Sequence, residues 1–403
     1  LQDRGAEALL DMRVRWGGSH HQKMVVIRHR DDPARDIAFV GGIDLSHARR
    51  DDHLHHGDPQ PQPLSKEYGD RPPWHDCQAA ITGPAVYDVE TSFRERWEDP
   101  TPLTRHPFRR LADAVRRLDV RADPLPAQQP PPPPAGPHAV QVLRTYPDLR
   151  QHRDYAFAVG GERSIARGYR KALARTERIV YLEDQYLWGH DVGESLTDTL
   201  EQHPDLHIVA VVPVVPDIDG AIGRTPQLLG RLHAISAVDE VAPGRVHVFS
   251  IENHAGTPVY VHAKICVLDD TWAVIGSDNF NRRSWTHDSE ISVGVVDQSD
   301  EATYARDLRL TMAAEHLDRD IDDLSSVEDC IEPLGMVRAF QESAERLQTW
   351  YDGGQVGERP PGRLLPIKPP EVGWFAQRWA EIPLRLLHDP DGRPRALRKR
   401  DAF

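Results

Sequence analysis

The sequence predicts an α/β protein with two lobes. A proline-rich tract at 124–137 divides the 403 residues, and such a tract favours an extended spacer over a packed core. On both sides of it, short β-branched runs alternate with stretches of helical periodicity, the pattern of an α/β fold. We therefore expect an N-terminal lobe over 1–123, a linker over 124–137, a C-terminal lobe over 138–350 and an irregular tail over 351–403.

Each lobe contains a predicted β-hairpin. Apolar runs at 24–27 and 37–42 flank a charged turn, and the runs at 265–268 and 272–277 repeat this arrangement. Short β-branched runs broken by polar turns are typical of hairpins, and the two form a weak internal repeat. Apolar periodicity also predicts a strand over 179–182 and helices over 86–97, 164–176, 302–317 and, within the tail, 374–387.

Composition argues against several classes of protein. Asp and Glu (63) outnumber Lys and Arg (49), whereas a dedicated nucleic-acid binder normally carries a basic surface. Cys77, Cys266 and Cys330 lack the spacing of a zinc site or a disulfide framework, so free thiols are expected. No apolar run approaches eighteen residues, so no transmembrane helix is predicted.

The first motif arrives only about twenty residues after Leu1. We therefore expect that the natural N-terminus is missing, and that the front lobe is short of strands and leaves apolar surface uncovered. Absence of a signal peptide consequently has little weight. A cytoplasmic or peripheral membrane location is favoured over secretion.

Two His-x-Lys pairs are the main functional indication. Lysine is scarce, six residues against forty-three arginines, yet two lysines follow a histidine by two positions, in His21-Gln22-Lys23 and His262-Ala263-Lys264. Positions i and i+2 of a strand share a face. An ammonium can neutralise phosphate oxygens while the imidazole attacks or transfers a proton. One pair alone would be an ordinary polar strand end, but two pairs that open similar hairpins predict one shared phosphate site.

The residues around the second pair have a specific spacing. His262-x-Lys264 is followed after four residues by Asp269 and after six more by Gly276-Ser277-x-Asn279. This pattern resembles the signature of the phospholipase D superfamily. The first pair matches less completely, because Arg28 stands where the motif Asp would be, Gly41 and Gly42 come later, and Asp44 replaces Asn279. Further strings resemble the plant-type and actinobacterial lipid-cleaving branches, at 41–45, 73–76, 83–85, 93–97, 181–186 and 253–258.

The resemblance covers residues 13 to 300 and implies a two-lobed α/β sandwich. Each lobe would hold a mixed sheet flanked by helices, and the active site would lie at the interface between the two lobes. His21 would attack phosphorus to form a phosphohistidine, and His262 would act as acid and base. Glu290 would orient His262, and Asp76 would be its counterpart in the front half. No metal or cofactor is needed for this chemistry. The remaining implied site residues are the oxygen-binding Lys23, Lys264 and Asn279 and the substrate-binding Gly41, Gly42, Asp44, Gly276, Ser277, Gln185 and Tyr186.

The resemblance implies a hydrolase or transphosphatidylase that acts on glycerophospholipids at a membrane surface, as a peripheral monomer. A cardiolipin-synthase-like phosphatidyltransferase is the nearest alternative. A nuclease of the superfamily is disfavoured by the net charge of −14 and by the pairing of both motifs in one chain. A catalytically dead scaffold is favoured only by Arg28.

Two other segments contain residue types that could form sites. The run at 51–58, Asp-Asp-His-Leu-His-His-Gly-Asp, has the residue types of a metal cluster. Its Gly, Pro and Asp neighbours favour a solvated loop near the mouth of the site. The basic run at 393–400 is expected to be a solvated chain end.

Overall fold

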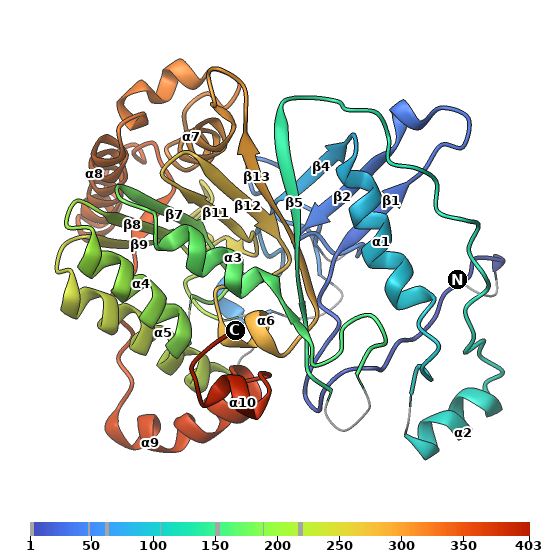
Figure 1. Ribbon diagram of the computed structural model, residues 1–403. Helices are drawn as coiled ribbons and strands as arrows, with labels where there is room; N and C mark the ends of the chain where they lie inside the picture. Colours follow the sequence, from blue (N-terminus) through green and yellow to red (C-terminus); the bar gives the residue numbers. More distant parts are fainter. Residues whose placement is uncertain are drawn as a thin grey trace.

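The computed structural model describes residues 4–46, 49–60, 64–104, 106–149, 154–187, 189–216 and 221–403. It confirms the α/β class, with a nine-stranded mixed sheet in the back half and a three-stranded sheet in the front half (Figure 1). No helix in these residues is long and apolar enough to cross a bilayer. The three cysteines are free, as expected.

The nine-stranded sheet forms the core of the back half. Its strands β7, β8 and β9 are parallel neighbours, and the other pairings are antiparallel. In sheet order the strands are β14 (Leu364–Pro366), β9 (Val246–Ile251), β8 (His207–Val211), β7 (Ile179–Glu183), β11 (Ile265–Leu268), β12 (Trp272–Gly276), β13 (Glu290–Asp297), β5 (His138–Tyr146) and β6 (Glu162–Arg163).

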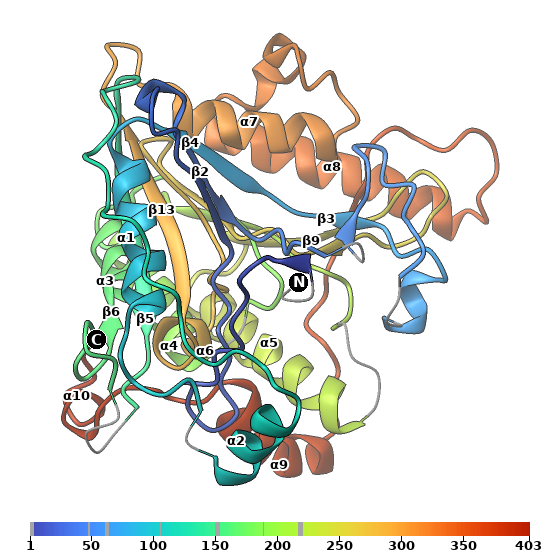
Figure 2. The ribbon, with the colours of Figure 1, turned by 90° about the vertical axis from the view of Figure 1, so that its right-hand side faces the viewer.

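Helices cover both faces of this sheet (Figures 1 and 2). Alternate residues of β7 show why: Ile179 and Tyr181 pack into one core cluster, and Val180 and Leu182 pack into another. A strand buried on both faces needs this continuous apolar run. The first cluster includes α7 (Tyr304–His316) and α8 (Pro333–Asp352), and the second includes α3 (Ser164–Leu173), α4 (His190–Gln202) and α5 (Ala221–Val241).

The front sheet is much narrower. Both predicted hairpins form, with Met24 opposite Val40 in the front half and Ile265 opposite Ile275 in the back half. The front sheet packs its apolar residues against α1 and β13. Its elements are β1 (Met24–Ile27), β2 (Ile37–Gly41), β4 (Gln78–Thr82) and the adjoining helix α1 (Ala85–Trp97).

Two short parallel pairings join the halves beside the predicted site. Strand β3 (Trp74–His75) pairs with β10 (Tyr260–Val261), and His20 forms an isolated parallel bridge with Ser289. Both predicted motif histidines follow directly after one of these pairings.

The segment 124–137 has no helix or strand and runs along the outside of the front half to β5 (Figure 1). It is docked on that half, because Arg28 donates to the carbonyls of Gln129 (3.4 Å) and Pro130 (2.8 Å).

The expectation of an irregular tail was incomplete. The predicted helix forms as α9 (Trp374–Pro383) with a π-helical turn at Leu384–His388, but β14 also extends the large sheet through main-chain pairing that no apolar pattern marks. Arg393, expected in a solvated end, is buried and contacts Asp191 at 3.2 Å. The shorter helices are α2 (Pro107–Val115), α6 (Arg282–Thr286) and α10 (Arg395–Arg398), with 3-10 turns at Pro33–Arg35, Lys66–Tyr68 and Leu324–Cys330.

Candidate active site

The two motif histidines lie at equivalent positions in the joint between the halves. The amide of His21 donates to the carbonyl of Ser289 at 2.9 Å, and the amide of His262 donates to the carbonyl of His75 at 2.8 Å. Each histidine is therefore held by main chain from the opposite half.

The carboxylates that orient the rings are exchanged between the halves. Nδ1 of His21 lies 3.0 and 3.1 Å from the two oxygens of Glu290, and Nδ1 of His262 lies 2.8 Å from Asp76. The predicted assignment of Glu290 to His262 and of Asp76 to the front-half histidine is therefore wrong.

The parallel pairings explain this exchange. The residue before each histidine pairs with the residue before a carboxylate of the other half, His20 with Ser289 and Val261 with His75. In a parallel pairing the next residues also lie side by side. Each carboxylate consequently reaches the histidine across the joint.

Buried hydroxyl groups hold Glu290 in place. Its two oxygens accept hydrogen bonds from Ser277 Oγ (2.5 Å) and Ser284 Oγ (2.7 Å). Burial raises the pKa of Glu290 to about 7, because desolvation disfavours a carboxylate. Ser277 was predicted to bind substrate, but its hydroxyl is committed to Glu290 and to the amide of Ile291 (3.0 Å), so it supports the orienting carboxylate instead.

The two lysines are buried beside their histidines. Lys23 Nζ donates to the carbonyl of His21 at 2.8 Å and lies 3.2 Å from Asp44. Lys264 Nζ donates to the carbonyl of His262 and to Gln185 Oε1, the latter at 3.4 Å. Burial lowers the pKa of Lys264 to about 8.

Both imidazoles are electrostatically suited to stay neutral. Desolvation, followed by the charges of Lys23 and Lys264, lowers the pKa of His21 well below its ordinary value. Desolvation, Lys264 and Arg49 do the same for His262. Each lysine affects both rings, which places the two His-x-Lys pairs in one electrostatic environment. A neutral imidazole keeps the lone pair that a nucleophile or base requires.

Among the small residues predicted to bind substrate, three have main-chain amides that are hydrogen-bonded within the protein. The amides of Gly42, Gly276 and Ser277 donate within the protein, to Cys77 (3.0 Å), Lys264 (3.2 Å) and Ile291 (3.0 Å) respectively. The glycines instead permit close packing. A Cβ would lie 2.5 Å from the Cys77 carbonyl at Gly41, 2.1 Å from Asp76 Oδ1 at Gly42, and 1.7 Å from Ser292 Oγ at Gly276.

The other predicted contacts have varied surroundings. Asn279 is buried, and its Oδ1 has no hydrogen-bond partner in the described part of the chain. Gln185 is buried and donates to Tyr260 (2.6 Å) and Tyr186 (3.0 Å) while accepting from Lys264, so it positions that ammonium. Tyr186 packs against the apolar cluster between α5 and the tail.

Sequence reasoning missed Arg49. Its Nη1 lies 2.9 Å from Nε2 of His262, and its guanidinium lies 2.7 Å from Asp44 and 4.9 Å from the ring centroid of Trp74. The guanidinium therefore covers Nε2, the ring nitrogen of His262 that does not face Asp76. No motif position marks this arginine, although it follows the 41–45 string by four residues.

The motif aspartate is structural in the back half. Asp269 has a positive φ of 49°, and its carboxylate accepts hydrogen bonds from the amides of residues 177, 178 and 179 at 2.6 to 2.9 Å. In the front half Asp36 accepts from the amide of His29 (2.5 Å) and pairs with Arg28 (2.8 Å). With Arg28 at the position of the motif Asp, the front turn lacks that carboxylate, and Asp36 supplies one in its place. Arg28 is therefore no sign of a dead site.

The run at 51–58 is partly buried, which corrects the expectation of a solvated loop. His55 is 3% exposed, and Asp51 accepts from the amides of Trp74 (2.6 Å) and Gly57 (2.8 Å). These contacts draw one side of the loop into the protein, while Asp52 and His56 remain exposed.

Two protein-family models match this chain. A family model described as phospholipase D matches residues 3–214, and one described as cardiolipin synthase, PLD-like domain, matches residues 233–309. Phospholipase D alpha 1 of Cynara cardunculus is 25% identical, over 90% of this chain and 56% of that relative. Phospholipase D alpha 4 of Arabidopsis thaliana is 25% identical, over 84% and 54%. The chain thus spans about half the length of the curated relatives it matches.

Two solved structures are also similar. Phosphatidylserine synthase of Haemophilus influenzae Rd KW20 is 12% identical with a TM-score of 0.45, over 88% of this chain and 67% of that chain. Nuc of Salmonella typhimurium, described as a phospholipase D family member, is 15% identical with a TM-score of 0.28, over 41% and 87%.

Proposed function

This chain belongs to the phospholipase D family, and on that premise we propose that it hydrolyses or transfers glycerophospholipid phosphodiesters through a phosphohistidine intermediate. The observation that carries the proposal is the exchanged pair of oriented histidines, His21 with Glu290 and His262 with Asp76. Two oriented imidazoles supply the nucleophile and the acid that covalent phosphoryl transfer requires. The buried lysines supply positive charge for the phosphate oxygens.

His21 is the better nucleophile. Its side chain is 26% exposed, against 3% for His262. Within the described residues its Nε2 has no hydrogen-bond partner, whereas Nε2 of His262 contacts Arg49. The Nδ1–H of His21 donates to Glu290, so the lone pair of Nε2 is available to attack phosphorus.

His262 then serves as the acid that protonates the leaving alcohol. For this step Arg49 must leave Nε2, and an anionic phosphodiester between the lysines offers the guanidinium a better partner. The same anion offsets the positive charges that lower the pKa of His262. With the anion bound, His262 takes a proton from solvent, and Asp76 stabilises the resulting imidazolium until that proton passes to the oxygen of the leaving alcohol. In the second step His262 removes a proton from water or an alcohol, which displaces the phosphatidyl group from His21.

The experiment uses a phosphatidyl ester of p-nitrophenol, whose leaving group departs without an acid. His262→Ala should release a stoichiometric burst of p-nitrophenolate and accumulate a phosphatidyl adduct on His21, detected by acid-free quenching and mass spectrometry. His21→Ala should give no burst. A burst in His21→Ala, with the adduct on His262, would reverse the roles, and no adduct in either variant would contradict the covalent mechanism.

The second candidate function differs in the molecule that accepts the phosphatidyl group. The match of residues 233–309 to a cardiolipin synthase domain favours transfer to the hydroxyl of another lipid, by the same chemistry. Water and alcohols present the same O–H to His262. Assays with phosphatidylcholine or phosphatidylglycerol, with and without ethanol, separate the outcomes. Phosphatidic acid and phosphatidylethanol indicate hydrolysis with transfer, and a diphosphatidyl product indicates synthase activity.

We further propose that the enzyme acts peripherally at a lipid surface. Helices α2 and α9 lie at the same end of the molecule (Figure 2) and expose Phe108 (76%), Leu111 (63%), Trp374 (61%) and Phe375 (81%). Exposed aromatic and apolar side chains on short helices suit insertion between lipid head groups. The monomeric state remains a prediction, to be checked by light scattering.

A further inference from the structure

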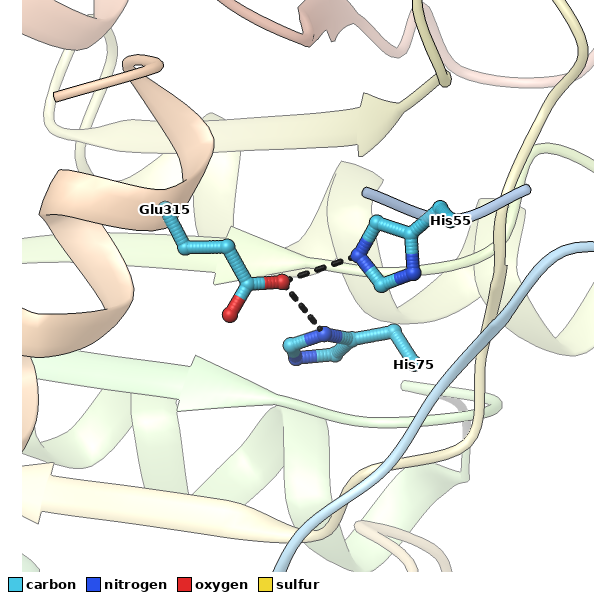
Figure 3. Close-up of side chains that lie close together, drawn as sticks. All are labelled: His55, His75 and Glu315. Carbon is cyan, nitrogen blue, oxygen red and sulfur yellow. Dashed lines mark hydrogen bonds and ion pairs between the residues drawn. The ribbon is translucent and has the colours of Figure 1, made fainter. Parts of the chain in front are cut away.

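Three side chains outside the catalytic pair converge on one point. His55 Nε2 lies 2.9 Å, and His75 Nδ1 lies 3.0 Å, from the same oxygen of Glu315 (Figure 3). The histidines come from the front half, and Glu315 comes from α7 in the back half. The two histidine side chains are 4 and 5% exposed, and that of Glu315 is 16% exposed, so the carboxylate connects the cluster to solvent.

The far nitrogen of each ring has an acceptor. Nδ1 of His55 lies 3.1 Å from the carbonyl of Trp74, and Nε2 of His75 lies 2.6 Å from Glu183. Glu183 is itself held by His316 Nε2 at 2.8 Å. Histidines that bind metals characteristically donate their other N–H to a carbonyl or carboxylate, which fixes the tautomer. With these outer contacts made, the nitrogens that face Glu315 are the ones through which the neutral rings could bind an ion.

We propose that His55, His75 and Glu315 bind one divalent transition-metal ion, with Zn²⁺ the best match to the ligand types. Two imidazoles and a carboxylate, with a fourth position for water, are a recurrent zinc coordination set. The ligand atoms of the three residues lie within 4.8 Å of one another. Zinc bonds of about 2.0–2.2 Å place tetrahedral ligands about 3.3–3.6 Å apart, so the two present contacts need to widen by about 0.3–0.7 Å.

The neighbouring group His75, Glu183 and His316 has ligand atoms equally close together, but it is a poorer site. His316 and Glu183 are both 0% exposed, and Glu183 also accepts from the hydroxyl of Tyr181 at 2.5 Å. Its carboxylate is thus saturated by donors and closed to solvent. It acts as the outer support of the proposed site, through His75.

The ion would have a structural function, apart from the phosphohistidine chemistry proposed above. The carbonyl of His75 accepts from the amides of His262 (2.8 Å) and Ala263 (3.1 Å), and Asp76 follows His75 in sequence. An ion bound to His75 and to α7 would hold the β3–β10 pairing in register. It would tie the two halves together without contacting substrate.

The test measures metal content and thermal stability in tag-free protein. Wild type purified from zinc-supplemented medium should contain about one zinc per chain, and a strong chelator should lower its Tm, since metal binding stabilises the folded state. His55→Ala and Glu315→Gln should lose the zinc and the chelator response. The matched control is His56→Ala, which changes the adjacent exposed histidine and should retain both.

A second measurement guards against variants that fail to fold. Chelated wild type is titrated with Co²⁺, whose visible absorption reports tetrahedral nitrogen and oxygen ligands, and Zn²⁺ should displace it. No copurified metal together with no change in Tm on adding Zn²⁺ would overturn the proposal and leave a protonated His–Glu network. Full metal content in folded His55→Ala would also overturn it, because the ion would then lie elsewhere.

Discussion

The methyl group added by Gly42→Ala tests how Asp76 orients His262. A Cβ at residue 42 would lie 2.1 Å from Asp76 Oδ1 and 3.1 Å from the carbonyl of His262. The carboxylate is the group that can yield, because the other contact is main chain. Gly42 therefore provides the space in which Asp76 reaches the histidine.

The size of the effect follows from the distances. Relieving the clash requires Oδ1 to move by about 1 Å. Because the carboxylate is rigid, this movement also displaces Oδ2, whose 2.8 Å contact with His262 Nδ1 weakens steeply with such a shift. A misplacement of about 1 Å in a catalytic constellation costs on the order of 10²-fold in rate, which corresponds to about 2.7 kcal/mol. We expect a loss of that order in kcat/KM on a soluble short-chain phospholipid.

A double-mutant cycle separates this route from general damage. Asp76→Ala alone should cost about 10³–10⁴-fold, as loss of an orienting carboxylate does. Adding Gly42→Ala to it should change the rate by less than about threefold, because the clash is gone and coupled residues are non-additive. Gly136→Ala is the control, since its Cβ would meet no atom within 4 Å. Circular dichroism verifies that each variant is folded at the assay temperature.

Two results would refute this reasoning. An unchanged rate in Gly42→Ala would mean that the carboxylate has room to move without leaving the histidine. An equal loss in the presence and absence of Asp76 would mean that the methyl group acts through the main chain of the joint instead.

Three further predictions concern the charged groups. The kcat/KM should fall as pH rises through about 8, because Lys264 must keep its proton and burial lowers its pKa to about 8. Lys264→Arg should move this alkaline fall to higher pH, and an unchanged pH profile would exclude Lys264 as its origin. Glu290→Gln should alter the tautomer and titration of His21 in ¹⁵N NMR and leave those of His262 nearly unchanged, and the opposite pattern would contradict the exchanged pairing. Asp269→Ala should reduce the free energy of unfolding by about 1–2 kcal/mol with kcat retained, and a lost kcat in folded protein would assign Asp269 a part in the chemistry.

Local sequence patterns predicted the framework well. Runs such as 24–27 and 265–268 are short, β-branched and bounded by charged turns, so the hairpins follow from nearest-neighbour preferences. The helices at 86–97 and 164–176 follow from apolar periodicity. Strand β14 was not predicted, because three residues carry too little periodicity to distinguish an edge strand from a loop.

The orienting contacts lay beyond such patterns. Which carboxylate meets His21 depends on a single parallel bridge between residues 269 positions apart, His20 and Ser289. The family resemblance implied Glu290 as the partner of His262, and only the tertiary pairing reverses this. Arg49 was missed because an arginine in a polar loop is indistinguishable, in sequence, from a solvated one.

Because the carboxylates are exchanged, both orienting contacts depend on the same docking of the two halves. If the halves slip or part, His21 loses Glu290 and His262 loses Asp76 in the same movement, since each bond crosses the same boundary. Under the proposed mechanism, a partly assembled form would lack an oriented nucleophile and an oriented acid together. We therefore expect activity to appear only once the two halves have docked.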